Sequence, residues 1–415
     1  MELANSNNIF SKSDFKEIRV MANDYLAAKG LPDKKNEEYK YTSISTLIEK
    51  TFGHTLTPTS KSELSAVSEF LIPDFDCYFL VLVNGKWKKE LSNYPAELQV
   101  NDQPDNAQIG TIAKIENNGF VALNALHFDH CLSIKIAESS QVNKPIFIIH
   151  ISDVQEENSI SMPRILIDLG EQSKSSFYVG YFSKGDYTSF TNAVVEVFSG
   201  KASHSRLTQI QNESNAAITH TNIYVQQSRD SNFNSICVSL GGKMVRNNLN
   251  VILDDENIES HLYGLYQLTD NQHVDNHTVV DHKKPNSVSN ELYKGILDEK
   301  STGVFNGKIY VRPSAQKTNA FQSNKNILLS NDAAVNTKPQ LEIWADDVKC
   351  SHGCTTGQLD EEQIFYLQSR GISKDMALKM VLKAFQHDIL SRIEVKAVVD
   401  YLDKEIIRRF GGENQ

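Results

Sequence analysis

The run Ile146-Phe147-Ile148-Ile149-His150-Ile151 is the first of several short β-type segments that fill the middle of this chain. Similar runs follow at residues 164–169 and 192–198, and they are separated by Asn, Ser, Asp and Gly. This alternation is typical of strands joined by tight turns. Residues 164–284 contain no proline, so the backbone donors needed for strand pairing are kept. The pattern fits a β-sandwich and a parallel β-helix equally well, because no clean repeat length is visible.

Helix signals flank this β-rich region on both sides. Near the N-terminus, apolar residues at helical spacing follow Ser13, and Gly30-Leu31-Pro32 ends the helix. Residues 76–85 predict a buried strand that runs into an Asn-Gly turn, so we expect an N-terminal α/β cap. Asp360 and Ser373 are predicted to cap helices in a C-terminal helical domain. The expected domains are residues 1–100, residues 101–345 for the β core, and residues 346–415.

Composition limits the molecules that the chain could bind and the environment in which we expect it. The 415 residues include 42 Lys and Arg against 52 Asp and Glu, a net charge of −10, which argues against binding nucleic acid through its phosphates. The mean hydropathy is −0.38 and the apolar runs are short, so we expect no membrane span. The N-terminus lacks the features of a secretory signal, so we expect a cytoplasmic protein. Five cysteines are too few for a disulfide framework.

Common catalytic motifs are missing from the sequence. The four Gly-Lys pairs continue with Trp87, Ala202, Met244 and Ile309 rather than Ser or Thr, so the chain has no Walker A motif of its own. The motifs G-x-G-x-x-G, H-E-x-x-H and G-x-S-x-G are also absent. We therefore expect a protein that is not a self-contained enzyme.

Two clusters contain metal-ligand residue types. On a strand, His273, Asp275 and His277 share one face, where they could bind a metal or, as we favour, form a hydrogen-bonded polar row. Residues 350–354 give a second set, because Cys350, His352 and Cys354 would also share one face of a strand. Two thiols and one imidazole suit iron, an iron–sulfur fragment or zinc, but they leave a tetrahedral site one ligand short. The alternative is two half-buried cysteines beside a surface histidine.

The region that contains the second cluster carries a family resemblance. Its residues Asp346 to Gly353, Thr356 to Glu361 and Ser369 to Ile372 closely resemble the SufB/SufD family of the SUF iron–sulfur cluster assembly system, and within it the SufD branch. Further matching segments are residues 30–32, 37–42, 83–85, 291–295, 303–307 and 311–318. The resemblance spans most of the chain and is most specific from residue 291 to 372.

The resemblance implies a right-handed parallel β-helix between the α/β cap and the helical domain. It also implies a non-catalytic scaffold that pairs with a SufB-like paralogue, forms a possible homodimer when alone, and docks a SufC-like ATPase through its C-terminal helices. We expect Phe365, Leu367 and Phe385 to contribute to that docking. His352 falls on the family histidine that helps to assemble a cluster at the SufB interface, and Cys350 falls on the neighbouring family cysteine. A cluster or iron would be bound only transiently, in the complex, and not stably by the isolated chain.

Two other assignments compete with this one. A SufB-like scaffold would carry a cysteine at Ala333 and a glutamate at Gly353, so the resemblance favours the SufD branch. Cys354 stands at a position where the family usually has alanine. Its thiol could add a metal ligand, or its side chain could simply fill space. A carbohydrate-active β-helix protein is the third possibility, suggested by the Asn-rich strands and by the acidic run Asp254-Asp255-Glu256.

Overall fold

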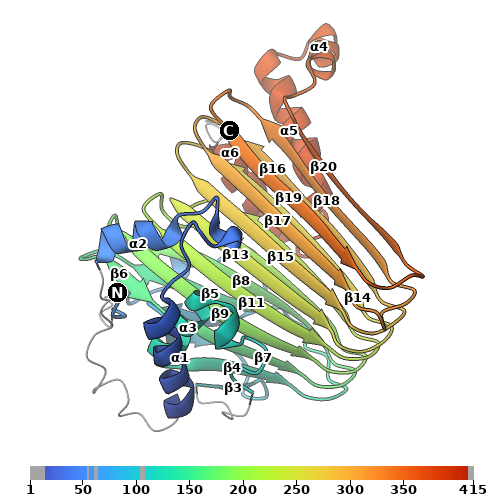
Figure 1. Ribbon diagram of the computed structural model, residues 1–415. Helices are drawn as coiled ribbons and strands as arrows, with labels where there is room; N and C mark the ends of the chain where they lie inside the picture. The colour runs from blue at the N-terminus through green and yellow to red at the C-terminus, as the bar shows by residue number, and fades with distance from the viewer. Residues whose placement is uncertain (1–14, 54–55, 60–63, 103–107, 410–415) are drawn as a thin grey trace.

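The computed structural model describes residues 15–53, 56–59, 64–102 and 108–409. From β7 (Arg164–Leu169) to β20 (Lys349–Gly357), nearly every strand lies in the opposite sheet to the strand before it, and neighbours within each sheet are parallel (Figure 1). This is the expected parallel β-helix, so the β-sandwich alternative is wrong. The molecule is mainly β, with an N-terminal α/β region and C-terminal helices.

The strands form two sheets that face each other across one apolar core. In spatial order the first sheet comprises β2 (Lys86–Asn93), β1 (Tyr78–Val83), β5 (Ile146–Asp153), β8 (Lys174–Lys184), β10 (His204–Gln211), β12 (Asn232–Ser239), β14 (Glu259–Leu268), β16 (Val288–Leu297), β18 (Asn319–Leu328) and β20. The second sheet comprises β19 (Ala334–Ile343), β17 (Thr302–Val311), β15 (His273–His282), β13 (Met244–Leu253), β11 (Ile218–Gln227), β9 (Ser189–Ser199), β7, β4 (Cys131–Ile136) and β3 (Gln99–Asn101), with β6 (Ser159–Ser161) beside β9.

Residues with positive φ angles form the corners where the chain passes from one sheet to the other. Several corner residues, among them Asp230, Asn257, Asp270 and Asn286, have positive φ angles between 53° and 64°. Asn and Asp tolerate this left-handed conformation better than most residues. The Asn and Asp residues between the β runs therefore allow the chain to turn sharply from one sheet to the other.

The N-terminal α/β region forms as the sequence predicts. Helix α1 (Lys16–Lys29) ends at Gly30, whose φ of 66° is easily adopted by glycine. Strands β1 and β2 form an antiparallel hairpin around Asn84 and Gly85, both with positive φ, as expected for an Asn-Gly turn. The remaining elements here are α2 (Ile44–Phe52), α3 (Gly119–His127) and the 3₁₀ turns η3 (Glu37–Tyr39), η4 (Ser68–Phe70) and η5 (Ile115–Asn117).

The C-terminal helices are α4 (Glu361–Ser369), α5 (Lys374–Leu390) and α6 (Lys396–Arg409). The Asp360 and Ser373 side chains accept hydrogen bonds from the first turns of α4 and α5, which confirms both predicted caps. Ile389 and Leu402 pack in an apolar cluster with outward-facing residues of the first sheet. Figure 1 shows α4 and the adjoining part of α5 projecting beyond the sheets. No helix in the described ranges is long and apolar enough to cross a bilayer.

Candidate functional site

Strand β20 brings the two thiols and the imidazole into one row. Cys350, His352 and Cys354 occupy alternate positions of this strand, so the predicted strand and its shared face are confirmed. β20 pairs in parallel with β18, and Cys350 lies opposite Ala320. Ala320 belongs to the apolar cluster between the two sheets, and Cys350 packs against the same cluster. The row therefore faces the interior of the β-helix.

The row lies where the β-helix ends. β19 and β20 are the outermost strands of their sheets, and in the described part of the chain each is paired on one side. We call these two strands with their unpaired edges the open end. His352 and Cys354 are exposed there, whereas Cys350 is half-buried. An unpaired edge readily adds a strand from another chain, so this surface is suited to a partner.

The geometry of the row limits what it can bind alone. Residues two apart on a strand are separated by roughly 6.6 Å, whereas zinc lies only about 2.0–2.3 Å from its nitrogen and sulfur ligands. Within the described ranges, no group of three or more His, Cys, Asp or Glu side chains could hold a metal ion. Cys350, His352 and Cys354 thus offer donors along a line, and further ligands from another chain would be needed to close a site.

The half-buried cysteine of the row is a weak ligand in the isolated chain. Burial raises the pKa of the Cys350 thiol above its ordinary value of 9.0. A thiol must lose its proton to bind a metal or to act as a nucleophile. Cys350 therefore remains protonated near neutral pH until a metal or another positive charge approaches it.

The first predicted cluster forms a hydrogen-bonded polar network on the outside of β15. Asp275 lies 2.9 Å from the Nε2 atom of His277 and 2.7 Å from the Nη1 atom of Arg246. The hydroxyl of Thr42 also donates to Asp275 and lies 3.0 Å from the Nε2 atom of His273. These contacts fix the N-terminal segment on the second sheet, so the polar-row interpretation accounts for the cluster.

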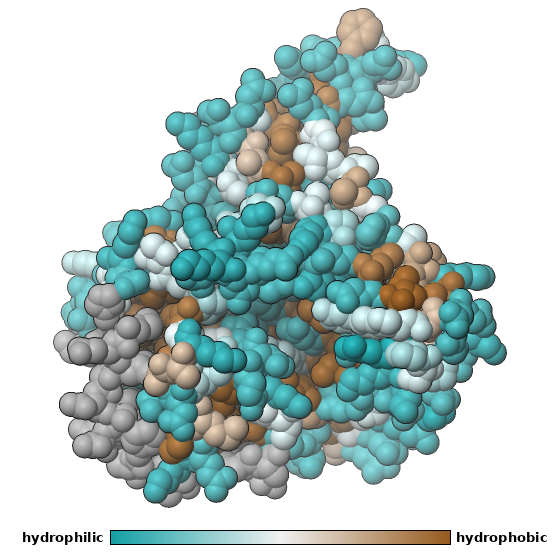
Figure 2. Space-filling view, in the orientation of Figure 1, coloured by the Kyte–Doolittle hydropathy of each residue, from teal (hydrophilic) through white to brown (hydrophobic). Residues whose placement is uncertain are grey.

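The three predicted docking residues have different surroundings. The Phe365 side chain in α4 is 72% exposed, and Leu367 is half-buried. Phe385 in α5 instead packs against the body, because the Nζ atom of Lys294 lies 4.3 Å from its ring centroid and donates to its carbonyl oxygen at 2.9 Å. Figure 2 shows hydrophobic residues among hydrophilic ones on the projecting arm that α4 and α5 form. Phe365 is therefore exposed to a partner, whereas Phe385 is half-buried and contacts Lys294 of the first sheet.

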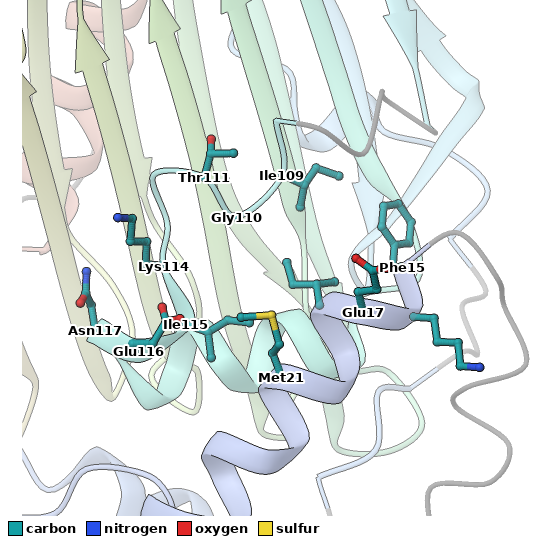
Figure 3. Close-up of a pocket in the computed structure, with 12 residues that line it drawn as sticks. Phe15, Glu17, Met21, Ile109, Gly110, Thr111, Lys114, Ile115, Glu116 and Asn117 are labelled. Carbon is teal, nitrogen blue, oxygen red and sulfur yellow. The ribbon is translucent and has the colours of Figure 1, made fainter.

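Two hollows could receive part of a partner, one beside these C-terminal helices and one in the N-terminal region. One, with a volume of about 680 Å³, lies between α4, α5 and the end of β18, and Phe365 is among its lining residues. The other, about 1030 Å³, lies between α1 and residues 109–117 (Figure 3). Its charged lining residues, such as Glu17 and Lys114, are exposed and form no buried constellation with one another. The hollow beside α4 is the better candidate for receiving part of a partner.

The acidic run that suggested carbohydrate chemistry is occupied in ion pairs. Asp254 lies 2.8 Å from Lys283, and Arg229 lies 3.2 Å from Asp255 and 3.3 Å from Glu256. General acid–base catalysis needs a carboxyl group that can reach a substrate and exchange its proton. Carboxylates held in ion pairs at the corner after β13 give no support to that alternative.

The strand register adds two residues that the sequence analysis did not identify. Gln322 of β18 lies opposite His352, and Glu291 of β16 lies opposite Gln322 on its other side. Both side chains are buried at 3% exposure. The glutamate and the glutamine are visible in the sequence, but only the pairing register places them in line with His352.

Comparison with known proteins gives a consistent assignment. Residues 150–385 match the family model described as SUF system FeS cluster assembly, SufBD core domain. Residues 4–148 match the model of the SufBD protein N-terminal region. Together the two models cover most of the chain.

Individual relatives agree with the family models. The iron-sulfur cluster assembly protein SufD of Escherichia coli is 30% identical, over 93% of this chain and 90% of the relative. An iron-sulfur cluster assembly SufBD family protein of Synechocystis is 29% identical, over 92% of this chain and 88% of the relative. A SufBD family protein of Mycobacterium leprae is 36% identical over a shorter region, 42% of this chain and 46% of the relative.

Proposed function

Because the chain belongs to the SufBD family of the SUF iron–sulfur cluster assembly system, we propose that it is a SufD-type scaffold subunit. In this role it has no catalytic activity of its own. It pairs with a SufB-like paralogue, and a SufC-like ATPase supplies the energy of ATP hydrolysis. The absence of a Walker A motif supports the assignment of ATP hydrolysis to the partner rather than to this chain. A cytoplasmic location is part of the same proposal.

One observation carries the proposal: Cys350, His352 and Cys354 line the open end without completing a metal site. The SufB-like partner pairs with the free edges of β19 and β20 and supplies the missing ligands. Iron and sulfide, the cargo of the complex, collect between the two chains and leave as a cluster. His352 is the principal donor, because its ring is exposed. A neutral imidazole can bind iron directly, whereas a cysteine thiol must first lose its proton.

The projecting arm and the part of α5 that contacts the first sheet have separate roles in this proposal. The SufC-like ATPase binds the projecting arm through Phe365 and Leu367 and the hollow beside α4. Phe385 supports the arm, because Lys294 fixes it to the first sheet. A movement imposed on the arm by the ATPase would reach the strands of the first sheet, including β20, through α5. In the absence of partners, the exposed edges allow the chain to form a homodimer.

A SufB-like role has less support. Position 333 is a buried alanine and position 353 is glycine, so neither supplies a thiol or a carboxylate. Transfer of sulfur to a SufB-type cysteine at position 333 is therefore not possible in this chain. Stable acceptance of sulfur by the isolated chain would favour the SufB-like role over the SufD-type role.

The proposal is tested by co-purification with the cognate SufB-like and SufC-like proteins, followed by anaerobic cluster reconstitution monitored by visible absorption. We compare the wild type, His352→Ala and the matched control Ser351→Ala, whose side chain lies on the other face of β20. We expect all three to form the complex and His352→Ala alone to lose cluster formation. Equal cluster formation by His352→Ala would remove His352 from the chemistry. A stable, stoichiometric cluster on the isolated chain would contradict the scaffold proposal.

A further inference from the structure

One interior row of the first sheet changes character toward the open end. Near the start of the β-helix the row is apolar, but its last three positions are polar. In order along the sheet, the row is Phe177, Leu207, Ser235, Leu262, Glu291, Gln322 and His352. A buried glutamate and glutamine cost free energy unless their hydrogen bonds are satisfied, so their position in line with His352 requires an explanation.

Hydrogen bonds fix the orientation of the first two polar residues. The hydroxyl of Thr278, from the opposite sheet, donates to Oε2 of Glu291 at 2.6 Å. The Nε2 atom of Gln322 donates to the same oxygen at 3.3 Å. Burial raises the pKa of Glu291 to about 7, and in either protonation state Oε2 can accept both bonds. Glu291 therefore holds the amide nitrogen of Gln322 toward the inside of the β-helix.

The space for this arrangement comes from Gly307 on the opposite sheet. A Cβ atom at position 307 would lie 2.0 Å from Nε2 of Gln322, so a larger residue would displace the amide. With its nitrogen held by Glu291, Gln322 leaves its carbonyl oxygen buried and without a hydrogen-bond partner among the described residues. A buried acceptor of this kind normally has a partner.

The next residue in the row supplies a suitable donor. Adjacent strands lie roughly 4.8 Å apart, so the imidazole of His352 is within reach of the Gln322 amide. The other two residues of the β20 row face no such acceptor. Cys350 lies opposite Ala320, and Cys354 lies opposite Asn324, whose amide oxygen already accepts a hydrogen bond from Asn326 at 2.7 Å.

We propose that Gln322 and Glu291 are positioning residues for His352. When the partner closes the open end, one ring N–H of His352 donates to the Gln322 carbonyl oxygen. The other ring nitrogen is then unprotonated and points away from the β-helix, toward iron or the nascent cluster. A second-shell acceptor of this kind fixes the tautomer and the direction of a ligating histidine. The inference rests on the proposed function, because it assigns support to the histidine that acts there.

The test uses the assembled complex with histidine labelled by ¹⁵N in this subunit alone. Solid-state NMR reports the tautomer of His352, which is assigned by the loss of its signals in His352→Ala. We expect one dominant tautomer in the wild type and a mixture of both in Gln322→Leu, together with a 10- to 100-fold slower cluster formation. Gln322→Glu keeps an acceptor oxygen and is expected to retain the single tautomer. Ser323→Ala, on the same strand with its side chain on the opposite face, is the control.

The outcomes separate this inference from the proposed function. An unchanged His352 tautomer in an intact Gln322→Leu complex would overturn the positioning role while leaving the scaffold role intact. Loss of the single tautomer in Gln322→Leu and its retention in Gln322→Glu would support the positioning role. Should Gln322→Leu fail to fold, Glu291→Leu gives the same test, because it removes the oxygen that accepts from the Gln322 amide and is expected to mix the tautomers. Normal cluster formation by His352→Ala would instead contradict the proposed function.

Discussion

The guanidinium carbon of Arg246 lies 3.9 Å from the ring centroid of Tyr39. This contact joins the second sheet to the short turn η3, which is more than 200 residues away in the sequence. The same guanidinium lies 2.7 Å from Asp275 and donates to the carbonyl oxygen of Glu38, also at 2.7 Å. Arg246 thus fixes the N-terminal segment to the outside of the β-helix and neutralises a buried carboxylate.

Replacing Arg246 should destabilise the whole protein. Arg246→Leu leaves Asp275 buried without its cation, and we expect the free energy of unfolding to fall by about 3–5 kcal/mol. Tyr39→Phe keeps the ring under the guanidinium and removes only the hydroxyl contacts, at a cost of about 1 kcal/mol. Urea denaturation measures both values. A loss below 1 kcal/mol for Arg246→Leu would show that the network does not stabilise the fold.

The stability of the chain should depend on pH through Glu213. Burial raises the pKa of this carboxyl to about 7, from an ordinary value of 4.5. Below pH 4.5 the group is protonated in both states, but between pH 4.5 and 7 only the folded state keeps the proton. The contribution of Glu213 to the stability therefore falls as pH rises through this window and is constant above it.

Glu213→Gln should remove this dependence. The amide can accept from Thr219 and Gln211 as the carboxyl does, but it has no proton to lose. The difference in unfolding free energy between variant and wild type should change by up to roughly 3 kcal/mol from pH 4.5 to pH 7, in favour of the variant. Parallel curves of stability against pH for the two proteins would contradict the assignment.

Several features of the fold were predictable from local sequence, whereas the stacking of the strands was not. The caps at Asp360 and Ser373 depend on side chains next to the backbone they bind, so their residue types predict them directly. The β-helix gives no clean period because its turns differ in length. Strands β11, β13, β15, β17 and β19 begin at residues 218, 244, 273, 302 and 334, so the repeat varies from 26 to 32 residues.

The candidate site was only partly predictable for a related reason. The spacing of Cys350, His352 and Cys354 predicts a shared face, because strand geometry has a period of two. Their position at the open end depends on which strand is last, and the alignment of Glu291 and Gln322 with His352 depends on pairing between strands about 30 residues apart. Sequence spacing within one strand contains neither piece of information.

Phe365 and Phe385 should respond differently to substitution. Phe365 is 72% exposed, so Phe365→Asp should change the unfolding free energy by no more than about 0.5 kcal/mol while abolishing binding of the SufC-like ATPase. Phe385→Ala removes packing beneath Lys294 and should cost about 1–3 kcal/mol. Calorimetric titration with the ATPase and thermal unfolding of each variant test the two effects. Full ATPase binding by a folded Phe365→Asp variant would exclude this surface.

Reactivity of the thiols should report coverage of the open end. Of the five cysteines, Cys354 is exposed, while Cys131 and Cys237 are buried and Cys77 and Cys350 are half-buried. Burial also raises the pKa of the Cys131, Cys237 and Cys77 thiols to about 12, which suppresses their thiolate forms. A disulfide reagent should therefore modify one thiol rapidly in the monomeric chain, and Cys354→Ser should abolish that fast phase.

Binding of the SufB-like partner should slow the same reaction. The partner is proposed to cover the edge of β20, so Cys354 should become at least tenfold less reactive in the complex, which corresponds to about 1.4 kcal/mol at 25 °C. The SufC-like ATPase alone binds the arm and should leave the fast phase unchanged, which makes it the control. Rapid modification of Cys354 in a verified complex with the SufB-like partner would show that the two chains meet elsewhere, and the shared-ligand arrangement at His352 would then fail with it.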